Sequence, residues 1–229
     1  MKKLRLGVLF SGGKDSVLAM HRVAEKEDVV CLITIVSENK ESYMFHTPNI
    51  DLVDYQAIAL DLPLIKVKTK GEKEKELLDL KRAIKKAKRD FELDGIVSGA
   101  VMSTYQKNRI QKICADVGLI CFNPLWQMNQ IDLLRELIKR KFDVRIVGVF
   151  AYPFSEKWLG KKIDESVVLD LIDLQNKYEI NPAGEGGEIE TFVLDAPLFK
   201  KKIKIEKSLL NYSNNAGVLN IKKISLLQK

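Results

Sequence analysis

The segment LRLGVLFSGGKDSVLAM, residues 4–20, decides the fold of this chain. It begins as a mainly apolar run, passes through two adjacent glycines and continues as a predicted helix. A short apolar strand that turns directly into a helix is typical of the first unit of a parallel α/β sheet. The turn lies at the N-terminus of the helix, where unpaired backbone N–H groups and the helix dipole attract an anion. The segment therefore predicts a strand, a glycine-rich anion-binding loop and a helix.

The loop itself carries the residue types that a phosphate site needs. Gly12 and Gly13 let the backbone turn tightly and approach a phosphate without a Cβ in the way. Lys14 adds a positive charge, whereas Asp15 would repel phosphate and therefore suggests a bound Mg²⁺ ion. We predict Asp15 as a metal ligand, and the following as residues of the phosphate site: Ser11, Gly12, Gly13, Lys14, Asp15 and Ser16. The alternative is a glycine-rich turn that binds no ligand.

This loop is not a Walker A motif. Counting from Gly7, the position of the Walker lysine holds Gly13, and Asp15 stands where that motif has Ser or Thr. The sequence instead resembles the SGGxDS loop of the ATP pyrophosphatase (PP-loop) superfamily. That resemblance implies that the β,γ-phosphates of ATP are held as a leaving group while the α-phosphate is exposed to attack. It also implies that residues 11–16 bind the nucleotide and that Lys14 and Asp15 are the catalytic residues.

Outward from the loop, the first two-thirds of the chain alternates apolar strands with helical patterns. Strands are expected at 4–10, 29–36, 64–67, 95–98, 119–122 and 144–150, and helices at 15–26, 49–61, 72–93, 103–117 and 129–141. Alternation with short connections predicts an α/β fold, a doubly wound parallel sheet with helices on both faces.

The pattern changes after about residue 150. A further helix is expected at 163–178, followed by a stretch too rich in Gly and Pro for regular structure. Antiparallel strands are then predicted at 191–194, 202–209 and 218–226. We therefore expect an ATP-binding domain over residues 1–150 and a smaller α+β, substrate-binding part over 151–229.

The composition excludes several classes of protein. Of the 229 residues, 46% are hydrophobic and 30% are charged, an ordinary balance for a globular protein. No apolar run approaches the ~20 residues that span a bilayer, and the N-terminus does not resemble a signal peptide. Three scattered cysteines do not form a disulfide framework. We therefore expect a cytoplasmic protein, whose net charge of +7 permits anionic partners.

Four further motifs narrow the class. They are SGAVMSTYQKNR at 98–109, NPLW at 123–126, GEGGEIET at 184–191 and MFHTPN at 44–49. The first of them follows the fourth expected strand, at the carboxyl end where open α/β sheets bind ligands. Together with the loop, these motifs resemble the diphthine–ammonia ligase family in its short archaeal form. The resemblance covers almost the whole chain, and the four motifs are far more family-specific than the loop.

The resemblance implies a reaction. ATP adenylates the carboxylate of diphthine, a modified histidine on translation elongation factor 2, and ammonia then displaces AMP to give diphthamide. The implied cofactors are ATP and Mg²⁺, and the implied partners are diphthine-bearing elongation factor 2 and ammonia. Free ammonia is expected because no spare domain could hold a glutaminase. We expect no membrane and no stable nucleic-acid partner, and the sequence leaves homo-oligomerisation open.

Residues of the first two of these four motifs are candidates for substrate and nucleotide binding. Gly99 and Ala100 are small enough for the ribose or α-phosphate to approach the strand end closely. Tyr105 and Arg109 share a helix face, and Arg109 is expected either to bind a phosphate or carboxylate or to form a structural salt bridge. Trp126 and Tyr105 are candidate aromatic walls for the quaternary ammonium group of diphthine.

The glycine-rich motif carries three carboxylates, those of Glu185, Glu188 and Glu190. Because acidic groups repel ATP, we expect them to meet a cation: Mg²⁺, ammonium or the positively charged substrate. The alternative is an acidic surface loop. His46 is a candidate substrate-binding residue or an ordinary loop histidine, and His21, inside the first helix, is expected to be structural.

Two other functions remain open at this stage. One is a PP-loop tRNA-modifying enzyme, which the basic face of the helix at 72–93 favours slightly, although that face is also what a solvated helix shows. The other is a non-catalytic nucleotide-binding regulatory module with the same α/β layout. Such a module needs neither Lys14 nor Asp15, and it leaves the acidic motif unexplained.

Overall fold

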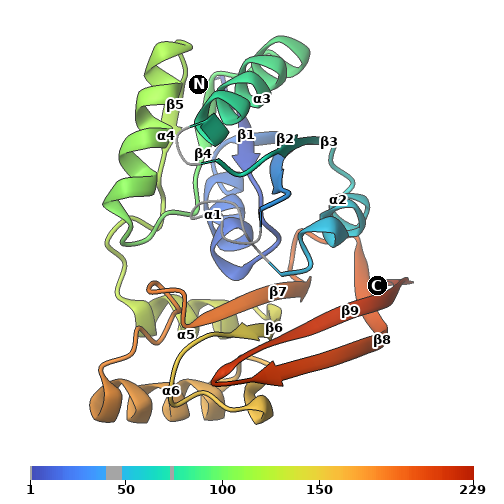
Figure 1. Cartoon of the computed structure of the whole chain (residues 1–229). Helices are drawn as coiled ribbons and strands as arrows, with labels where there is room; N and C mark the ends of the chain where they lie inside the picture. The colour runs from blue at the N-terminus through green and yellow to red at the C-terminus, as the bar shows by residue number, and fades with distance from the viewer. Residues whose placement is uncertain (1, 40–47, 73–74) are drawn as a thin grey trace.

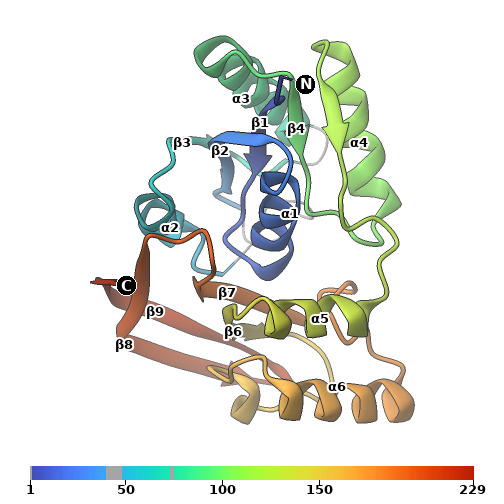
Figure 2. The ribbon, with the colours of Figure 1, turned by 180° about the vertical axis from the view of Figure 1, so that it is seen from behind.

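A computed structural model describes residues 2–39, 48–72 and 75–229 of the chain. Within these ranges the strands form two sheets, one parallel with five strands and one antiparallel with four. Figure 1 and the reverse view in Figure 2 show the second sheet beyond α1, at one end of the first layer. No helix among the described residues is long and apolar enough to cross a membrane.

The first sheet has the strand order β3-β2-β1-β4-β5, and every pair in it is parallel. Its strands are β1 (Arg5–Leu9), β2 (Asp28–Ser37), β3 (Leu64–Thr69), β4 (Gly95–Val97) and β5 (Ile120–Phe122). The chain runs from β1 outward through β2 to β3 and then crosses to the other side for β4 and β5. The order therefore reverses between β1 and β4, where open α/β sheets bind ligands at the carboxyl ends of the strands.

Helices cover both faces of this sheet, as a doubly wound fold requires. They are α1 (Lys14–Ala24), α2 (Val53–Leu60) after a 3₁₀ turn (Ile50–Leu52), α3 (Lys75–Phe91) and α4 (Thr104–Asp116). Successive residues of β2 alternate between two cores: Leu32 packs with α1 and α2, whereas Cys31 and Ile33 pack with α3 and α4. The expected α/β fold is confirmed.

The second sheet has the order β7-β6-β9-β8 and corrects one sequence-based expectation. Its strands are β6 (Asp143–Val149), β7 (Ile189–Asp195), β8 (Lys201–Ser213) and β9 (Ala216–Gln228). The strand expected at 144–150 was grouped with the parallel sheet, and that grouping is wrong. It is β6, a central strand that pairs antiparallel with both β7 and β9.

The physical reason for this error is the burial of β6 on both faces. Neighbouring residues such as Ile146 and Val147 are both fully buried, which gives the continuous apolar run typical of a parallel strand. Here the cover comes from elsewhere, because residues of α5 (Gln130–Lys139) and α6 (Glu165–Tyr178) share the core that contains β6.

Polar contacts join the two sheets at several points beyond the shared core. Asn49, in a left-handed conformation before the 3₁₀ turn, donates from Nδ2 to the carbonyl oxygen of Leu219 (3.0 Å) and accepts from the amide of Ile221 (2.9 Å). The β8–β9 hairpin is thereby fixed against the segment that follows β2. Two cavities lie along this junction.

Candidate active site

The loop Ser11–Ser16, here called the phosphate loop, lies at the carboxyl end of β1, beside the point where the strand order reverses. Gly13 is the N-cap of α1 and has no side chain of its own with which to cap the helix. The backbone amide of Lys14 donates to Thr191 Oγ1 at 3.1 Å, which anchors the start of the helix to β7 of the second sheet. The N-terminal end of α1 is thus presented toward the space between the two sheets.

Gln56 of α2 supports the phosphate loop from beneath, and the sequence analysis did not identify it. Its side chain is fully buried, and Nε2 donates to the carbonyl oxygens of Gly12 (2.9 Å) and Val193 (2.8 Å). A Cβ on Gly12, which has φ +77°, would lie 2.1 Å from Gln56 Oε1, so only glycine fits. The available signal was a single amide within the otherwise largely apolar stretch of α2.

Gly99 makes room for the phosphate loop in a way that differs from the expectation. A Cβ at this position would lie 2.9 Å from the backbone nitrogen of Ser16. Gly99 therefore lets the end of β4 contact the first turn of α1, and it also lines the cavity. Ala100 is buried, and its amide donates to Ser98 Oγ at 3.1 Å. Its contact with a nucleotide stays a prediction.

A cavity of about 540 Å³ opens at this point, and we call it the phosphate cavity. Its walls come from the phosphate loop, the segment after β4, Phe150, and the acidic segment Gly184–Thr191 that leads into β7. Of the predicted site residues, the cavity is lined by Ser11, Gly13, Lys14, Asp15, Gly99, Glu185 and Glu190. Motifs that are up to 180 residues apart in sequence thus form one enclosure, and Ser103, Gln106 and Thr191 are unpredicted members of it.

Lys14 and Asp15 form an ion pair in the wall of the cavity, with 2.8 Å between Nζ and Oδ2. The Lys14 side chain is only 4% exposed. Burial acts to lower the pKa of Lys14, but Asp15 and the carboxylates of the acidic segment outweigh burial and raise that pKa. Lys14 therefore stays positively charged at every physiological pH.

The acidic segment contributes two carboxylates to the same cavity. Burial raises the pKa of Glu190 to about 7, with Lys14 opposing the shift and Asp15 adding to it. The pKa of Glu185 is also raised, first by burial and then by Asp15. Glu185 Oε2 accepts a hydrogen bond from the amide of Met102 (3.0 Å), which ties the acidic segment to the β4–α4 connection. With all groups ionised, three carboxylates face one lysine, so the cavity complements a cation as well as phosphate.

Glu188 has a different environment from the other two glutamates. It accepts hydrogen bonds from the amide and the side-chain nitrogen of Asn181 (2.9 and 2.7 Å) and from the amide of Gly186 (2.8 Å). These contacts hold the acidic segment in shape, and Glu188 is not among the residues lining the phosphate cavity. Its expected role in substrate binding stays a prediction.

Tyr105, Arg109 and Trp126 lie outside the lining of the phosphate cavity. The guanidinium carbon of Arg109 stands 3.4 Å from the centre of the Tyr105 ring, so the two side chains share a helix face as expected. Lys107 Nζ covers the Trp126 ring at 4.1 Å. A cation of the protein itself therefore lies against one face of each ring, so that face is not open to a substrate cation.

The two histidines differ in how far the structure describes them. His46 lies outside the described residues. His21 is buried, and its Nδ1 lies 2.7 Å from the carbonyl oxygen of Val17 while Nε2 accepts from the amide of Leu198 (3.1 Å). Burial lowers its pKa to about 4. This neutral, fully used imidazole matches the expected structural role.

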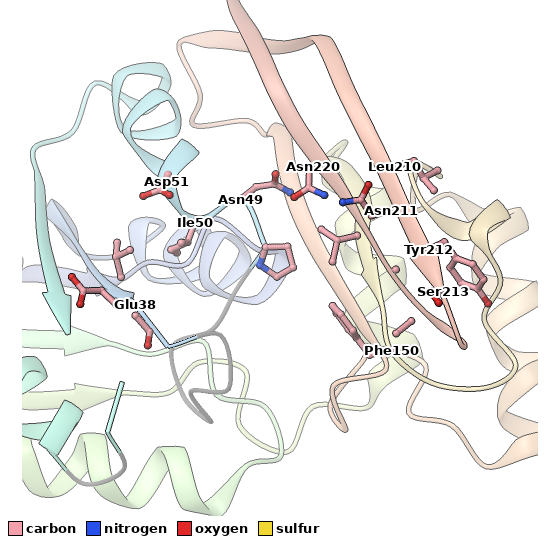
Figure 3. A pocket seen from close by; sticks show the side chains of 16 residues that line it. Glu38, Asn49, Ile50, Asp51, Phe150, Leu210, Asn211, Tyr212, Ser213 and Asn220 are labelled. Atoms are coloured by element: carbon pink, nitrogen blue, oxygen red, sulfur yellow. The ribbon is translucent and has the colours of Figure 1, made fainter. Parts of the chain in front are cut away.

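A second cavity, of about 940 Å³, lies next to the first between β2 and the β8–β9 hairpin. Figure 3 shows Glu38, Asn49 and Asp51 on the side of the first sheet, facing Asn211 and Asn220 on the hairpin. Phe150 lines both cavities, so the two are neighbours along the junction of the sheets. We call this space the hairpin cavity.

The residues present fit a Mg²⁺ ion at one position. Asp15 Oδ1 is buried without a hydrogen-bond partner among the described residues. No group of three or more potential ligands from His, Cys, Asp and Glu occurs in the part of the chain that the structure describes. Mg²⁺ does not need such a cage, because it is commonly held by one or two carboxylates together with substrate phosphates and water.

These features define a class of protein. A buried lysine and a helix N-terminus at the switch point of a parallel sheet suit a polyphosphate, and the carboxylates opposite suit a cation or an electrophilic reaction partner. Fold and site together are those of an α/β enzyme that acts on a nucleotide.

Comparison with known proteins identifies the family within this class. The model of the diphthamide synthase N-terminal domain matches residues 4–121, and that of the diphthamide synthase C-terminal domain matches residues 129–227. The diphthine–ammonia ligase of Homo sapiens is 38% identical over 226 residues, covering 90% of this chain and 84% of the human protein. That of Rattus norvegicus is 36% identical over 225 residues with the same coverage. The chain belongs to the diphthamide synthase family, and the expected ligase class is confirmed.

Solved structures give a weaker similarity. A predicted subunit of a tRNA methyltransferase from Methanocaldococcus jannaschii is 17% identical, with a TM-score of 0.44 over 85% of this chain and 98% of that one. Similarity at this level has no bearing on the activity.

Proposed function

We propose that this protein catalyses the ATP-dependent amidation of diphthine on translation elongation factor 2 by ammonia. A carboxylate oxygen of diphthine would attack the α-phosphorus of ATP, and pyrophosphate would leave. Ammonia would then attack the acyl carbon, and AMP would leave to give diphthamide. One observation carries the proposal: Lys14, the start of α1 and the carboxylates Glu185 and Glu190 line a single cavity. Family membership supports the identity of the substrate.

The phosphate loop has the chemistry to hold the leaving pyrophosphate. Lys14 and the N-terminal end of α1 would neutralise the negative charge that develops as the bond to the α-phosphorus breaks. Asp15 would hold Mg²⁺, which supplies further neutralisation of the phosphates when bound. Gly12 and Gly99 keep the loop in place, because neither position has room for a side chain.

We propose that the adenosine moiety occupies the hairpin cavity. This cavity lies at the carboxyl end of β2 and shares Phe150 with the phosphate cavity, so one ligand with an anionic end and a neutral end can extend through both. Glu38 and the amides of Asn211 and Asn220 offer acceptors and donors for ribose and base. Diphthine would then reach the α-phosphate from the side of Glu185 and Tyr105.

The tRNA-modifying alternative loses support from the surface of α3. Most of its basic residues are paired with acidic or carbonyl groups: Lys81 with Asp116, Arg82 with Asp79, Lys86 and Arg89 with Asp90, and Lys88 with the carbonyl oxygen of Val117. Such internal pairing reduces the positive potential that phosphate backbones recognise.

An isotope-exchange experiment tests the proposed function. Labelled pyrophosphate should exchange into ATP only when diphthine-bearing elongation factor 2 is present, because exchange requires reversible adenylation of the carboxylate. The unmodified factor is the control. Equal exchange with the two forms of the factor, or none with either, would reject the proposal.

A further inference from the structure

Glu190 occupies a position in the phosphate cavity that the adenylation step leaves unused. The fold fixes it there in two ways. The hydroxyl of its neighbour Thr191 accepts a hydrogen bond from the amide of Lys14 (3.1 Å). Gly148 of β6 is the antiparallel strand partner of Glu190 in the second sheet. A Cβ on Gly148 would lie 3.0 Å from Glu190 Cβ and 2.6 Å from the Phe150 ring, so glycine leaves space for both side chains.

The Glu190 side chain is partly buried, and its carboxylate is uncommitted. Among the residues described, it forms no hydrogen bond and no ion pair, although it lines the cavity. The other acidic groups in the cavity have partners: Asp15 pairs with Lys14, and Glu185 accepts a hydrogen bond from the amide of Met102. A carboxylate that is partly removed from water and has no protein partner is stabilised by a ligand or by a proton.

The charged groups around Glu190 come from the start of α1 and from its own acidic segment. Lys14 and Asp15 project from the start of α1, and Glu185 projects from the acidic segment. The cavity-lining residues from α4 and its preceding turn, Gln106 and Ser103, are uncharged. The pKa of Glu190 is raised to about 7, chiefly by burial, so the group can both release and accept a proton near neutrality.

The proposed reaction needs such a group. Ammonia exists mainly as ammonium at neutral pH, and ammonium has no lone pair with which to attack an acyl-adenylate. Lys14 cannot take the proton because it stays charged. Asp15 is already paired with Lys14, and in the proposed function it also holds the Mg²⁺ ion of the phosphates. The carboxylates of Glu185 and Glu190 are left as the groups that can attract a small cation into the cavity.

We propose that the phosphate cavity binds the ammonium co-substrate between Glu185 and Glu190, and that Glu190 is the general base that deprotonates it. This inference rests on the proposed function. One N–H bond breaks, its electron pair stays on nitrogen, and the proton moves to the Glu190 carboxylate. The nitrogen lone pair then forms the bond to the acyl carbon, while the bond from carbon to the AMP oxygen breaks. A second proton passes from the attacking nitrogen to solvent as the amide forms.

The test compares Glu190→Gln with the wild type, using two nucleophiles. Hydroxylamine is largely uncharged at pH 7, so it needs no base to attack the acyl-adenylate. We expect kcat/KM for ammonium to fall about 10²–10⁴-fold in Glu190→Gln. Formation of the hydroxamate from hydroxylamine should stay within about threefold of the wild-type rate. Glu156→Gln, at an exposed position outside both cavities, is the matched control and should change neither rate.

Three results separate this inference from its competitors. Equal losses with ammonium and hydroxylamine would overturn the base role. A raised Mg²⁺ requirement for pyrophosphate exchange in Glu190→Gln would instead make Glu190 a metal ligand and also overturn it. Retained exchange with a selective loss of ammonium use supports the inference. Absence of exchange in the wild type would reject the proposed function itself, which is a distinguishable failure.

Discussion

At the scale of single residues, the site works by burying opposite charges together. Lys14 is 4% exposed but keeps its charge because Asp15 lies 2.8 Å away and further carboxylates face it. In a low-dielectric cavity such charges interact more strongly than in water. In the proposed reaction the lysine would therefore face the leaving group without having to reorganise.

Replacing Lys14 should remove this contribution without emptying the space that the side chain fills. We expect Lys14→Met to lower the rate of AMP formation about 10²–10³-fold, the usual effect of losing one preorganised charge contact. Methionine has a similar length and packs well in irregular sites. Lys26→Met, at an exposed position after α1, is the control. AMP formation in Lys14→Met at the wild-type rate would contradict the assignment.

His21 should make the stability of the protein depend on pH. Its pKa is lowered to about 4, so between that value and the ordinary pKa of 6.5 the unfolded state binds more protons than the native state. The free energy of unfolding should therefore fall as the pH drops from about 6.5 to about 4, by roughly 3 kcal/mol in total.

Urea denaturation at pH 7 and pH 5 measures this effect. His21→Gln loses the buried contacts of the imidazole, so it should be less stable than the wild type at pH 7. Because glutamine does not titrate, the variant should lose less stability than the wild type between pH 7 and pH 5. A loss in the variant equal to that of the wild type would show that other groups are responsible.

At the scale of elements, the acidic segment is a loop shaped by its own side chains. Glu188 binds the amide of Gly186 and both nitrogens of Asn181, while Gly184 and Gly187 adopt positive φ angles. Gly186 and Gly187 are exposed at the edge of the phosphate cavity. Few apolar contacts hold this tip, so its local stability should be low.

Nucleotide binding should therefore protect the acidic segment. We expect ATP with Mg²⁺ to slow amide hydrogen exchange of residues 184–187 about tenfold or more, because the ligand supplies partners for the cavity wall. The turn at 116–119, outside both cavities, should not change. Identical exchange of residues 184–187 with and without nucleotide would argue against closure of this segment.

The elements also show what the sequence could and could not predict. The phosphate loop was predictable because its spacing and its place between a strand and a helix are local features. The sheet to which β6 belongs was not, because burial on both faces gives the same apolar run in either kind of sheet. Gln56 was missed for a related reason: its importance comes from two carbonyl groups that are distant in sequence, at Gly12 and Val193.

The different environments of the three glutamates in the acidic segment were equally hidden. In the sequence, Glu185, Glu188 and Glu190 form one acidic cluster. In the fold, the side chain of Glu188 bonds to backbone amides of its own loop, whereas Glu185 and Glu190 line the cavity. Only the three-dimensional path of the segment separates these roles.

At the scale of the whole molecule, the candidate active site lies at the junction of the two sheets. One wall comes from the carboxyl ends of the parallel strands and the other from the antiparallel sheet, so neither sheet alone would enclose ATP in the proposed mode of binding. Asn49 and Thr191 connect the two across this junction. Stability and nucleotide binding should therefore be coupled through these contacts.

Asn49→Gly tests this coupling, since glycine accepts the left-handed backbone of Asn49 but removes both hydrogen bonds. We expect a loss of about 1–3 kcal/mol in the free energy of unfolding and weaker ATP binding by calorimetry. Asn215→Gly, an exposed left-handed position in the β8–β9 turn, is the matched control. Equal effects of the two substitutions would show that the connection to β9 does not matter.

The central claim is that the diphthine carboxylate attacks the α-phosphorus of ATP in the phosphate cavity. Labelling that carboxylate with ¹⁸O on elongation factor 2 tests it most directly, with mass spectrometry of the nucleotide products after one turnover with ammonia. The account predicts AMP that carries one labelled oxygen, together with unlabelled pyrophosphate. Unlabelled AMP, or ADP with the label in inorganic phosphate, would contradict it.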